Sequence, residues 1–202
     1  WFVSVSPDIA LQESFIDYVI QGQGEIPFRE FTIALLNNQS VETIAGLGFE
    51  KLGQLTLNKK TAPVDEKNFP CIDFSKIDVD KIVAVNGSTD CPSLNYIATT
   101  GCPYNCSFCC LASVWGKKTF SRETDVVISD LKKLKTLYGI RKLSFDDDHF
   151  FGNRRFVVET CEQMIAQNLE IDWEANAHIS TFLKKYSDTD LQLIKLAGCR
   201  SI

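Results

Sequence analysis

One stretch decides the fold class: KLSFDDDHFFGNRRFVVETCEQMIAQN, residues 142–168. Its first seven residues, Lys142–Asp148, predict a β-strand, because apolar and polar side chains alternate where it begins. From Phe156 onward, Val157, Cys161 and Met164 recur at helical spacing and predict a helix that runs to Asn168. The stretch is therefore one strand followed by one helix.

The same unit recurs on both sides of this stretch. Upstream, LNYIATT (94–100) predicts a strand and a helix begins at about Glu123. Downstream, IDWEANAHI (171–179) predicts a strand, TDLQLIKLAG (189–198) a helix, and CRSI (199–202) the start of a fourth strand. Such alternation indicates parallel strands joined by right-handed crossovers. Three and a half units fit an incomplete barrel better than a finished open sheet.

The N-terminal part has a different pattern, which is typical of the C-terminal end of an α/β domain. A short strand is expected at Tyr18–Ile20, followed by a loop at Gly22–Glu25 and a helix from Pro27, a residue favoured in a first turn. A short helix from about Ser40 and a β-hairpin around Lys51–Gly53 should follow.

The segment from Thr61 to about Cys91 has no sustained periodicity and contains several prolines, which is typical of a linker. We therefore divide the chain into an α/β end at 1–60, a linker at 61–92 and the strand–helix units at 93–202. Because the chain opens on Trp and its one methionine is Met164, we expect it to be an internal fragment of a longer protein.

Composition excludes several classes of protein. The 202 residues are 45% hydrophobic, enough for a normal buried core. A net charge of −5 without a basic run argues against nucleic acid as a partner. No uninterrupted apolar run approaches 18 residues, and the opening WFVSVSPDIA lacks a basic n-region, so neither a membrane span nor a signal peptide is expected. Four of the eight cysteines are clustered within residues 102–110, which favours metal binding in a reducing, cytoplasmic compartment over disulfides.

The cysteine cluster follows the predicted strand at 94–100. Cys102, Cys106 and Cys109 form a C-x3-C-x2-C pattern at the edge where parallel α/β folds place their chemistry. Three thiolates on one loop can occupy three corners of a [4Fe–4S] cluster, which normally takes four cysteines. One iron would then stay open for another ligand. Cys110 fits no ligand spacing, and we predict it to be a core residue that begins the next turn.

Other interpretations of the cluster exist. Structural zinc sites usually have two ligand pairs, but no second C-x2-C or H-x3-5-H is present, and His149 and His178 stand alone in the sequence. The ferredoxin pattern C-x2-C-x2-C-x3-C-P is also absent. A third interpretation is a set of buried structural cysteines. A module that binds iron–sulfur or zinc without catalysing a reaction is a further alternative for the cysteine cluster.

The loop resembles the signature of radical S-adenosylmethionine enzymes, with a GCP turn after a strand and an aromatic residue, Phe108, before the last cysteine. The resemblance implies a full or partial (βα) barrel in which Cys102, Cys106 and Cys109 hold a [4Fe–4S] cluster. It implies that the open iron binds the amino and carboxylate groups of S-adenosylmethionine, with Phe108 near this cofactor. Reduction would then cleave S-adenosylmethionine to methionine and a 5′-deoxyadenosyl radical.

Weaker motifs resemble one branch of this superfamily, whose members carry an N-terminal cobalamin-binding domain. In chain order they are DYVIQGQGE (17–25), GLGFEKLGQL (46–55), FDDDHF (145–150), WEANAHI (173–179) and IKLAGC (194–199). The resemblance implies that the barrel is preceded by the C-terminal end of a flavodoxin-like, Rossmann-type domain, and that cobalamin is a cofactor bound mostly outside this segment.

The D-x-H-x-x-G motif that supplies a histidine to cobalt in many members is absent, so neither His149 nor His178 is assigned as a cobalt ligand. Gly22, Gly24 and Glu25 follow a strand end, where flavodoxin-like folds bind cofactors, and are the candidates for lining the cobalamin tail. A plain tight turn is the alternative for these three residues.

The acidic strand end offers a second candidate site. Asp146 and Asp148 should share one face of the strand, with Asp147 on the other. The resemblance implies that one of the two holds the amino group of S-adenosylmethionine, and a carboxylate suits an ammonium group. The alternative is a helix N-cap with acidic first-turn residues.

Two further features are expected to have no direct catalytic role. His178, at the end of the third strand, is expected to be a structural histidine. Trp115, Arg122 and the turn at 116–118 follow the cysteine loop and are expected to form a solvated cover. No catalytic side chain is assigned.

The function predicted from the resemblance is radical methylation, or a carbon-skeleton rearrangement, at an unreactive carbon. The substrate would be a small molecule of natural-product or lipid type, and a reductant such as flavodoxin or ferredoxin would supply the electron. The second hypothesis is a cobalamin-independent radical enzyme that resembles the methylthiotransferases. The non-catalytic module is the third.

Overall fold

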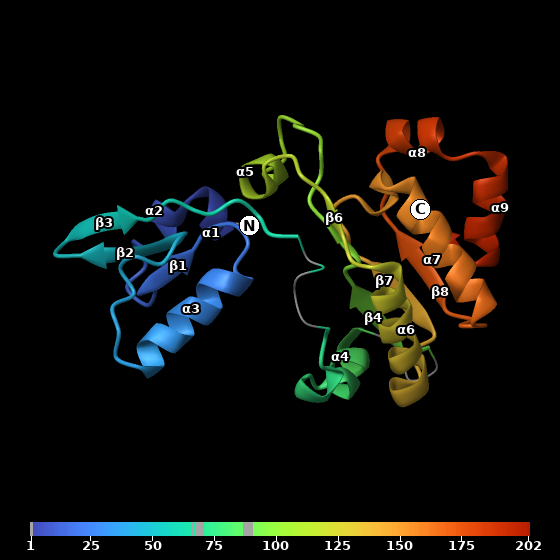
Figure 1. Cartoon of the computed structure of the whole chain (residues 1–202), viewed down its shortest axis with the longest axis horizontal. Helices are drawn as coiled ribbons and strands as arrows, with labels where there is room; N and C mark the ends of the chain where they lie inside the picture. The colour runs from blue at the N-terminus through green and yellow to red at the C-terminus, as the bar shows by residue number, and fades with distance from the viewer. Residues whose placement is uncertain (1, 66, 68–70, 87–90) are drawn as a thin grey trace. The chain divides into compact units, whose positions relative to one another are not determined.

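The computed structural model describes residues 2–65, 67, 71–86 and 91–202. The chain forms two compact units, one made of Trp1–Val64 with Cys102–Lys118 and the other of Asp65–Gly101 with Thr119–Ile202 (Figure 1). The cysteine loop thus groups with the N-terminal segment, although the sequence pattern places it within the strand–helix units.

The first unit is built on a three-stranded antiparallel sheet in the order β1-β2-β3. Its elements are α1 (Phe2–Val5), α2 (Pro7–Ala10), β1 (Tyr18–Ile20), α3 (Glu25–Leu36), β2 (Leu47–Lys51), β3 (Gln54–Leu57) and α5 (Leu111–Trp115). The predicted strand and hairpin are confirmed. The flavodoxin-like arrangement predicted for this part is built on parallel strands, and the described strands of this unit pair antiparallel instead.

Two helix predictions in this unit change. Helix α3 begins at Glu25, so Pro27 lies in its first turn rather than at its first position. The short helix expected from Ser40 is wrong, because residues 40–46 form turns. The side chain of Asn58 donates to the carbonyl oxygens of Glu42 and Ile44, at 2.8 Å each, and so takes the place of helical N–H donors.

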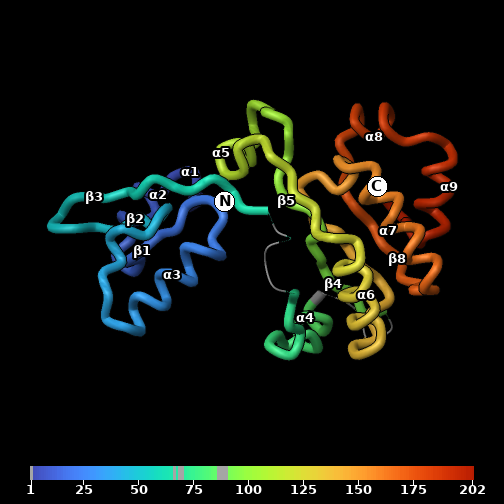
Figure 2. The backbone as a smooth tube through the Cα atoms, in the orientation of Figure 1, coloured from blue at the N-terminus to red at the C-terminus, as the bar shows by residue number. Residues whose placement is uncertain are grey.

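The second unit holds a four-stranded parallel sheet in the order β4-β7-β8-β9. Its strands are β4 (Ser93–Tyr96), β7 (Lys142–Phe145), β8 (Asp172–Ala175) and β9 (Cys199–Ser201). Helices α6 (Thr124–Tyr138), α7 (Arg154–Ala166) and α9 (Asp188–Leu196) connect the strands and lie side by side (Figure 2). The predicted alternation of parallel strands and helices is confirmed.

Strand alternation gives this sheet two different faces. Leu143, Phe145 and Trp173 are buried in one core with the apolar faces of α6 and α7. On the other face of the same strands, Asn95 is exposed and Ser144 and Glu174 are half-buried. The helix-covered face is therefore apolar and the opposite face polar.

Several elements of the second unit are missing from the sequence prediction. They are η2 (Phe74–Lys76) and α4 (Val79–Asn86) in the predicted linker, the short strands β5 (Thr99–Thr100) and β6 (Phe120–Ser121), η3 (Phe150–Gly152), and α8 (Ile179–Lys185). The strand expected at 94–100 is divided into β4 and β5. Strand β7 ends at Phe145 because the next residues direct their carboxylates to backbone amides, as described below.

Candidate functional site

The cysteine loop spans the chain between β5 and β6. These short strands pair antiparallel, with Thr99 opposite Ser121 and Thr100 opposite Phe120, so they bring the two ends of the loop together. Inside the loop, the N–H of Cys109 donates to the carbonyl of Cys106 at 3.0 Å, which closes a tight turn. Two of the predicted ligands therefore share one turn.

The donor set suits an iron–sulfur cluster. Cys102, Cys106 and Cys109 are half-buried thiols within eight residues, and thiolates are the usual ligands of such clusters. Phe108, between two of them, is 91% exposed. Among the described residues, no three Cys, His, Asp or Glu side chains converge on one metal-ion position.

The segment after the third cysteine is a short helix rather than core. Cys110 is half-buried, so its prediction as a core residue is wrong, but it does begin α5 as the N-cap residue. Within the same unit, Lys60 donates from Nζ to the carbonyl of Ser113 in α5, at 2.6 Å. Trp115 is buried, and Gly116 ends the helix in the left-handed conformation at φ 63°.

The remaining cysteines fall into two groups. Cys161 and Cys199 are buried in the second unit, and burial raises the pKa of their thiols to about 12 and about 11. These thiols stay protonated at neutral pH and do not offer the thiolate that iron needs. Cys71 and Cys91 are exposed.

The three aspartates after β7 have three different environments. Asp146 is exposed, and its carboxylate accepts from Asn95 Nδ2 at 2.6 Å and from Ser144 Oγ at 2.7 Å. Asp147 is buried and accepts from the N–H groups of Ala98 and Thr99. The predicted separation of Asp146 from Asp147 is confirmed.

Asp148 is half-buried and accepts from the N–H of Gly101 at 2.8 Å. The alternative role of the aspartates as a helix N-cap is wrong, since Asn153 caps α7 by accepting from the N–H of Phe156. The hydrogen bonds from backbone N–H groups to Asp147 and Asp148 could not be predicted. Strand periodicity indicates the face of the sheet on which a side chain lies, but not the groups that it contacts there.

Burial controls the charge of this region. Burial raises the pKa of Asp147 to about 7, against the opposing effect of the hydrogen bonds from Thr99 and Ala98. Burial also raises the pKa of Asp148, and the N–H of Gly101 opposes that shift. Asp147 therefore changes its charge near neutral pH.

Arg122 follows the other end of the cysteine loop and is not solvated as expected. Its side chain is 11% exposed, and Nη1 donates to Tyr96 Oη at 2.5 Å and to Asp130 Oδ2 at 3.1 Å. Tyr96 Oη donates in turn to Asp130 at 3.0 Å, and the backbone N–H of Arg122 donates to the carbonyl of Ala98. The residue is part of a buried polar network between β4 and α6.

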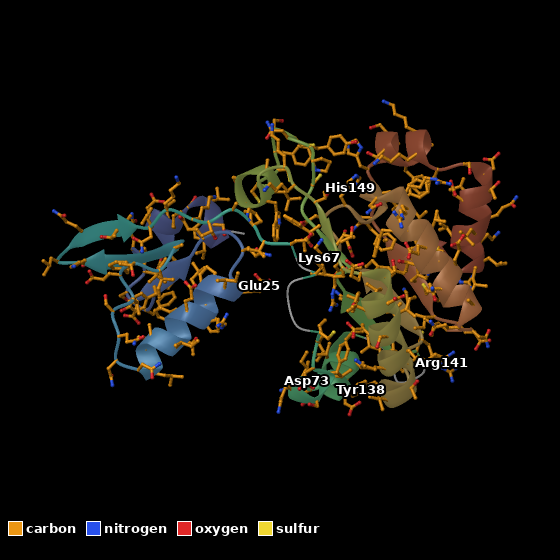
Figure 3. All side chains as sticks on the ribbon, viewed as in Figure 1. Glu25, Lys67, Asp73, Tyr138, Arg141 and His149 are labelled. Atoms are coloured by element: carbon orange, nitrogen blue, oxygen red, sulfur yellow. The ribbon has the colours of Figure 1, made fainter. Side chains whose placement is uncertain are left out.

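The two histidines lie together at the ends of β7 and β8. The buried ring of His149 (Figure 3) is 6.1 Å from the ring of His178, centroid to centroid. His178 Nδ1 is within hydrogen-bond distance of the Ser180 and Thr181 hydroxyl groups, as a structural histidine would be. Burial lowers the pKa of His149, and the positive charges of His178 and Lys185 lower it further.

The loop after β1 contains the candidates for cobalamin binding. Gly22 has φ 82° and donates its N–H to Ser4 Oγ at 2.9 Å. Gly24 is the N-cap residue of α3, and Glu25 is the first residue of that helix (Figure 3). The side chain of Gln23 exchanges two hydrogen bonds with the backbone of Val64, which holds the loop. The role of these residues in cobalamin binding stays a prediction.

Comparison with known proteins identifies relatives of this chain. No protein-family model matches it. An uncharacterized methyltransferase of Pyrococcus horikoshii is 29% identical over 205 residues, which cover 99% of this chain and 42% of that protein. The radical S-adenosylmethionine methyltransferase TsrM of Kitasatospora setae, solved with tryptophan substrate and an analogue of S-adenosylmethionine, matches 98% of this chain with a TM-score of 0.79 and 18% identity.

That match covers 39% of the TsrM chain, and a second structure of TsrM holds cobalamin and a [4Fe–4S] cluster. OxsB, a cobalamin-dependent radical enzyme solved with aqua-cobalamin and S-adenosylmethionine, matches 97% of this chain and 28% of its own, with a TM-score of 0.74 and 16% identity. The chain is similar in fold to these two radical S-adenosylmethionine enzymes and in sequence to the Pyrococcus methyltransferase. The resemblance predicted from the cysteine motif is confirmed.

The relatives are longer than this chain, which spans between 28% and 42% of the three proteins above. At these identities the solved structures show the fold, which is α/β with a parallel sheet. No described helix combines the length and the apolar character that crossing a membrane requires.

Proposed function

We propose that the protein containing this chain is a radical S-adenosylmethionine methyltransferase whose [4Fe–4S] cluster is held by Cys102, Cys106 and Cys109. The observation that carries the proposal is the C-x3-C-x2-C loop, whose two ends continue into the paired strands β5 and β6, in a chain whose α/β fold is similar to those of TsrM and OxsB. Methyl transfer is favoured over rearrangement because the Pyrococcus relative and TsrM are both named methyltransferases. The sheet would be the first part of a (βα) barrel.

Each group of residues has a defined task in this proposal. The three thiolates would hold the cluster, which would supply the electron for the reductive cleavage of S-adenosylmethionine. Asp146, on the polar side of β7 and open to solvent, accepts hydrogen bonds from the ammonium group of S-adenosylmethionine. Asp148 assists through Oδ1, since Oδ2 is engaged by Gly101. Phe108 is exposed and available to contact the cofactor.

Cobalamin is the second cofactor in the proposal, because structures of both TsrM and OxsB contain it. Gly22, Gly24 and Glu25 would line its tail, at a glycine-containing loop that follows a strand and begins a twelve-residue helix. The substrate would be a small molecule, in keeping with the tryptophan bound by TsrM. A flavodoxin- or ferredoxin-type reductant would supply the electron. The eight cysteines, all thiols here, suit a reducing cytoplasm.

Anaerobic reconstitution of the full-length protein with iron and sulfide tests the proposal. Wild type should bind about four irons per chain, the content of a single [4Fe–4S] cluster. Cys102→Ala, Cys106→Ala and Cys109→Ala should each lose the cluster. Cys110→Ala is the matched control, because this thiol is adjacent, half-buried and not a proposed ligand. Stoichiometric zinc without iron, or cluster loss in Cys91→Ala alone, would contradict the assignment.

A further inference from the structure

The sheet ends in an unusual way where the cysteine loop begins. The last backbone bond between β4 and β7 runs from the N–H of Asp146 to the carbonyl of Tyr96, at 3.0 Å. Beyond it, side chains rather than backbone carbonyls of the β7 segment accept from the amides of the β4 segment. Ala98 and Thr99 donate to Asp147, and Gly101 donates to Asp148.

These amides need acceptors because they lie in the interior of the second unit. Ala98 is fully buried, Thr99 is 4% exposed, and Asp147 itself is 4% exposed. A buried N–H without a partner costs as much as a lost hydrogen bond, and a carboxylate is a stronger acceptor than a carbonyl. The two aspartates thus continue the strand pairing with their side chains and hold residues 98–101.

The backbone at the end of this segment has a restricted shape. Gly101 is buried and has φ 78°, a left-handed conformation that glycine adopts without strain. The bond from its N–H to Asp148 holds this residue in place. The next residue in the chain is Cys102. Asp148 therefore determines where the chain enters the cysteine loop.

The other end of the loop is fixed to the same segment. Strand β6 pairs with β5, and the N–H of Arg122 donates to the carbonyl of Ala98 at 3.0 Å. The Arg122 side chain is held in turn by Tyr96 and Asp130. Both ends of the loop consequently depend on the conformation of residues 98–101.

We propose that Asp147 and Asp148 are positioning residues for the cysteine loop: their carboxylates fix residues 98–101 and so fix where Cys102 can bind iron. The proposal deepens the function proposed above and rests on it only for the identity of the metal cluster. It gives Asp148 a task that requires an acceptor oxygen rather than a negative charge, so asparagine should substitute for aspartate there and alanine should not.

Amide hydrogen exchange in the full-length protein without its cluster tests the backbone part of the proposal. Asp147→Ala should speed exchange at Ala98 and Thr99 at least tenfold, and Asp148→Ala should do the same at Gly101. Asp148→Asn should exchange at Gly101 within about threefold of wild type, since one acceptor oxygen is kept. Unchanged exchange in Asp148→Ala would overturn the proposal. Asp148 is half-buried, so its replacement should disturb folding less than that of the buried Asp147. If Asp147→Ala does not fold, Asp148→Ala alone tests the proposal.

Asp190→Asn is the control for a general loss of stability. Asp190 is a buried carboxylate of the same unit, and it accepts hydrogen bonds from Ser187 and Arg154. Its variant should leave exchange at Gly101 unchanged. Equal acceleration at Gly101 in Asp190→Asn and Asp148→Ala would show that the effect is global and would also overturn the proposal.

Electron paramagnetic resonance of the reduced, reconstituted protein without S-adenosylmethionine tests the link to the cluster. Asp148→Ala should alter the spectrum and Asp148→Asn should restore it. An unchanged spectrum in Asp148→Ala would contradict the link between residues 98–101 and the iron site. If the wild type binds no iron while exchange changes as expected, the proposed function fails and the positioning role stands.

Discussion

At the scale of single residues, the carboxyl group of Asp147 should make the stability of the folded protein depend on pH. Burial raises its pKa from 3.8 to about 7. The folded protein therefore binds more protons than the unfolded chain between these two values. The free energy of unfolding should then fall as the pH rises from about 4 to about 7 and should be flat outside this window with respect to Asp147.

Asp147→Asn removes this titration while keeping an oxygen that accepts from Ala98 and Thr99. The variant should be more stable than wild type above pH 7, by up to about 4 kcal/mol from three pKa units, and the difference should shrink as the pH falls. Urea denaturation at several values between pH 5 and 8 measures it. Wild type and Asp147→Asn must be compared at each pH, because the lowered pKa of His149 makes the free energy of unfolding change with pH in the opposite direction. The contribution of His149 is the same in both proteins and cancels in the difference.

No change in the stability difference between pH 5 and 8 would contradict this assignment. So would a difference that grows as the pH falls, because that is the behaviour of a carboxylate with a lowered pKa.

Asp146 is the residue for which charge rather than acceptor geometry should matter. Loss of a charge-assisted hydrogen bond costs about 1.5–3 kcal/mol, so Asp146→Asn should weaken the binding of S-adenosylmethionine about ten- to a hundredfold with the cluster content unchanged. Titration of the reconstituted full-length protein measures the affinity.

Glu174→Gln is the matched control for Asp146, since this half-buried carboxylate lies on the same polar face of the neighbouring strand and pairs with Lys142 at 3.4 Å. It should bind S-adenosylmethionine like wild type. Equal weakening in the two variants would point to a general effect of negative charge and remove Asp146 from the site.

At the scale of elements, the Arg122–Tyr96–Asp130 network joins β4, α6 and the end of the cysteine loop. Asp130 is fully buried, and its other cation, Lys133, lies 3.8 Å away on the surface side of α6. Arg122→Met should therefore leave a buried carboxylate without its main partner and destabilise the protein by about 3–5 kcal/mol. Chemical denaturation measures the loss.

Asp130→Asn combined with Arg122→Met should recover part of that stability, because the uncompensated charge is removed as well. A loss below about 1 kcal/mol in Arg122→Met alone would show that the network does not stabilise the element packing.

The elements that the sequence predicts are those with long periodic patterns. Lys142–Phe145 followed by the helical spacing of Val157, Cys161 and Met164 was enough to predict β7 and α7. Helix α8 was not predicted because it is short and follows directly from a segment, IDWEANAHI, whose first half is a strand. The division into β4 and β5 depends on side chains more than forty residues away, which no local pattern contains.

At the scale of the whole molecule, the cysteine spacing predicted the resemblance to radical S-adenosylmethionine enzymes, and the strand alternation predicted the parallel sheet. In the N-terminal unit the hairpin around Lys51–Gly53 was predicted correctly, whereas the flavodoxin-like arrangement is not seen, because β1 also pairs antiparallel. The prediction that Arg122 is solvated was wrong. A charged residue in a loop is usually exposed, and the pattern around Arg122 does not show that it pairs with the buried Asp130.

We propose above that the cysteine loop holds a [4Fe–4S] cluster with one iron open to S-adenosylmethionine. Electron paramagnetic resonance of the reduced full-length protein, recorded with and without S-adenosylmethionine, tests it most directly. Saturating S-adenosylmethionine should change the spectrum of wild type, because its amino and carboxylate groups would bind the open iron. Cys106→Ala should give no cluster signal. A cluster spectrum that stays identical at saturating S-adenosylmethionine would contradict the claim and leave an electron-transfer or structural cluster in its place.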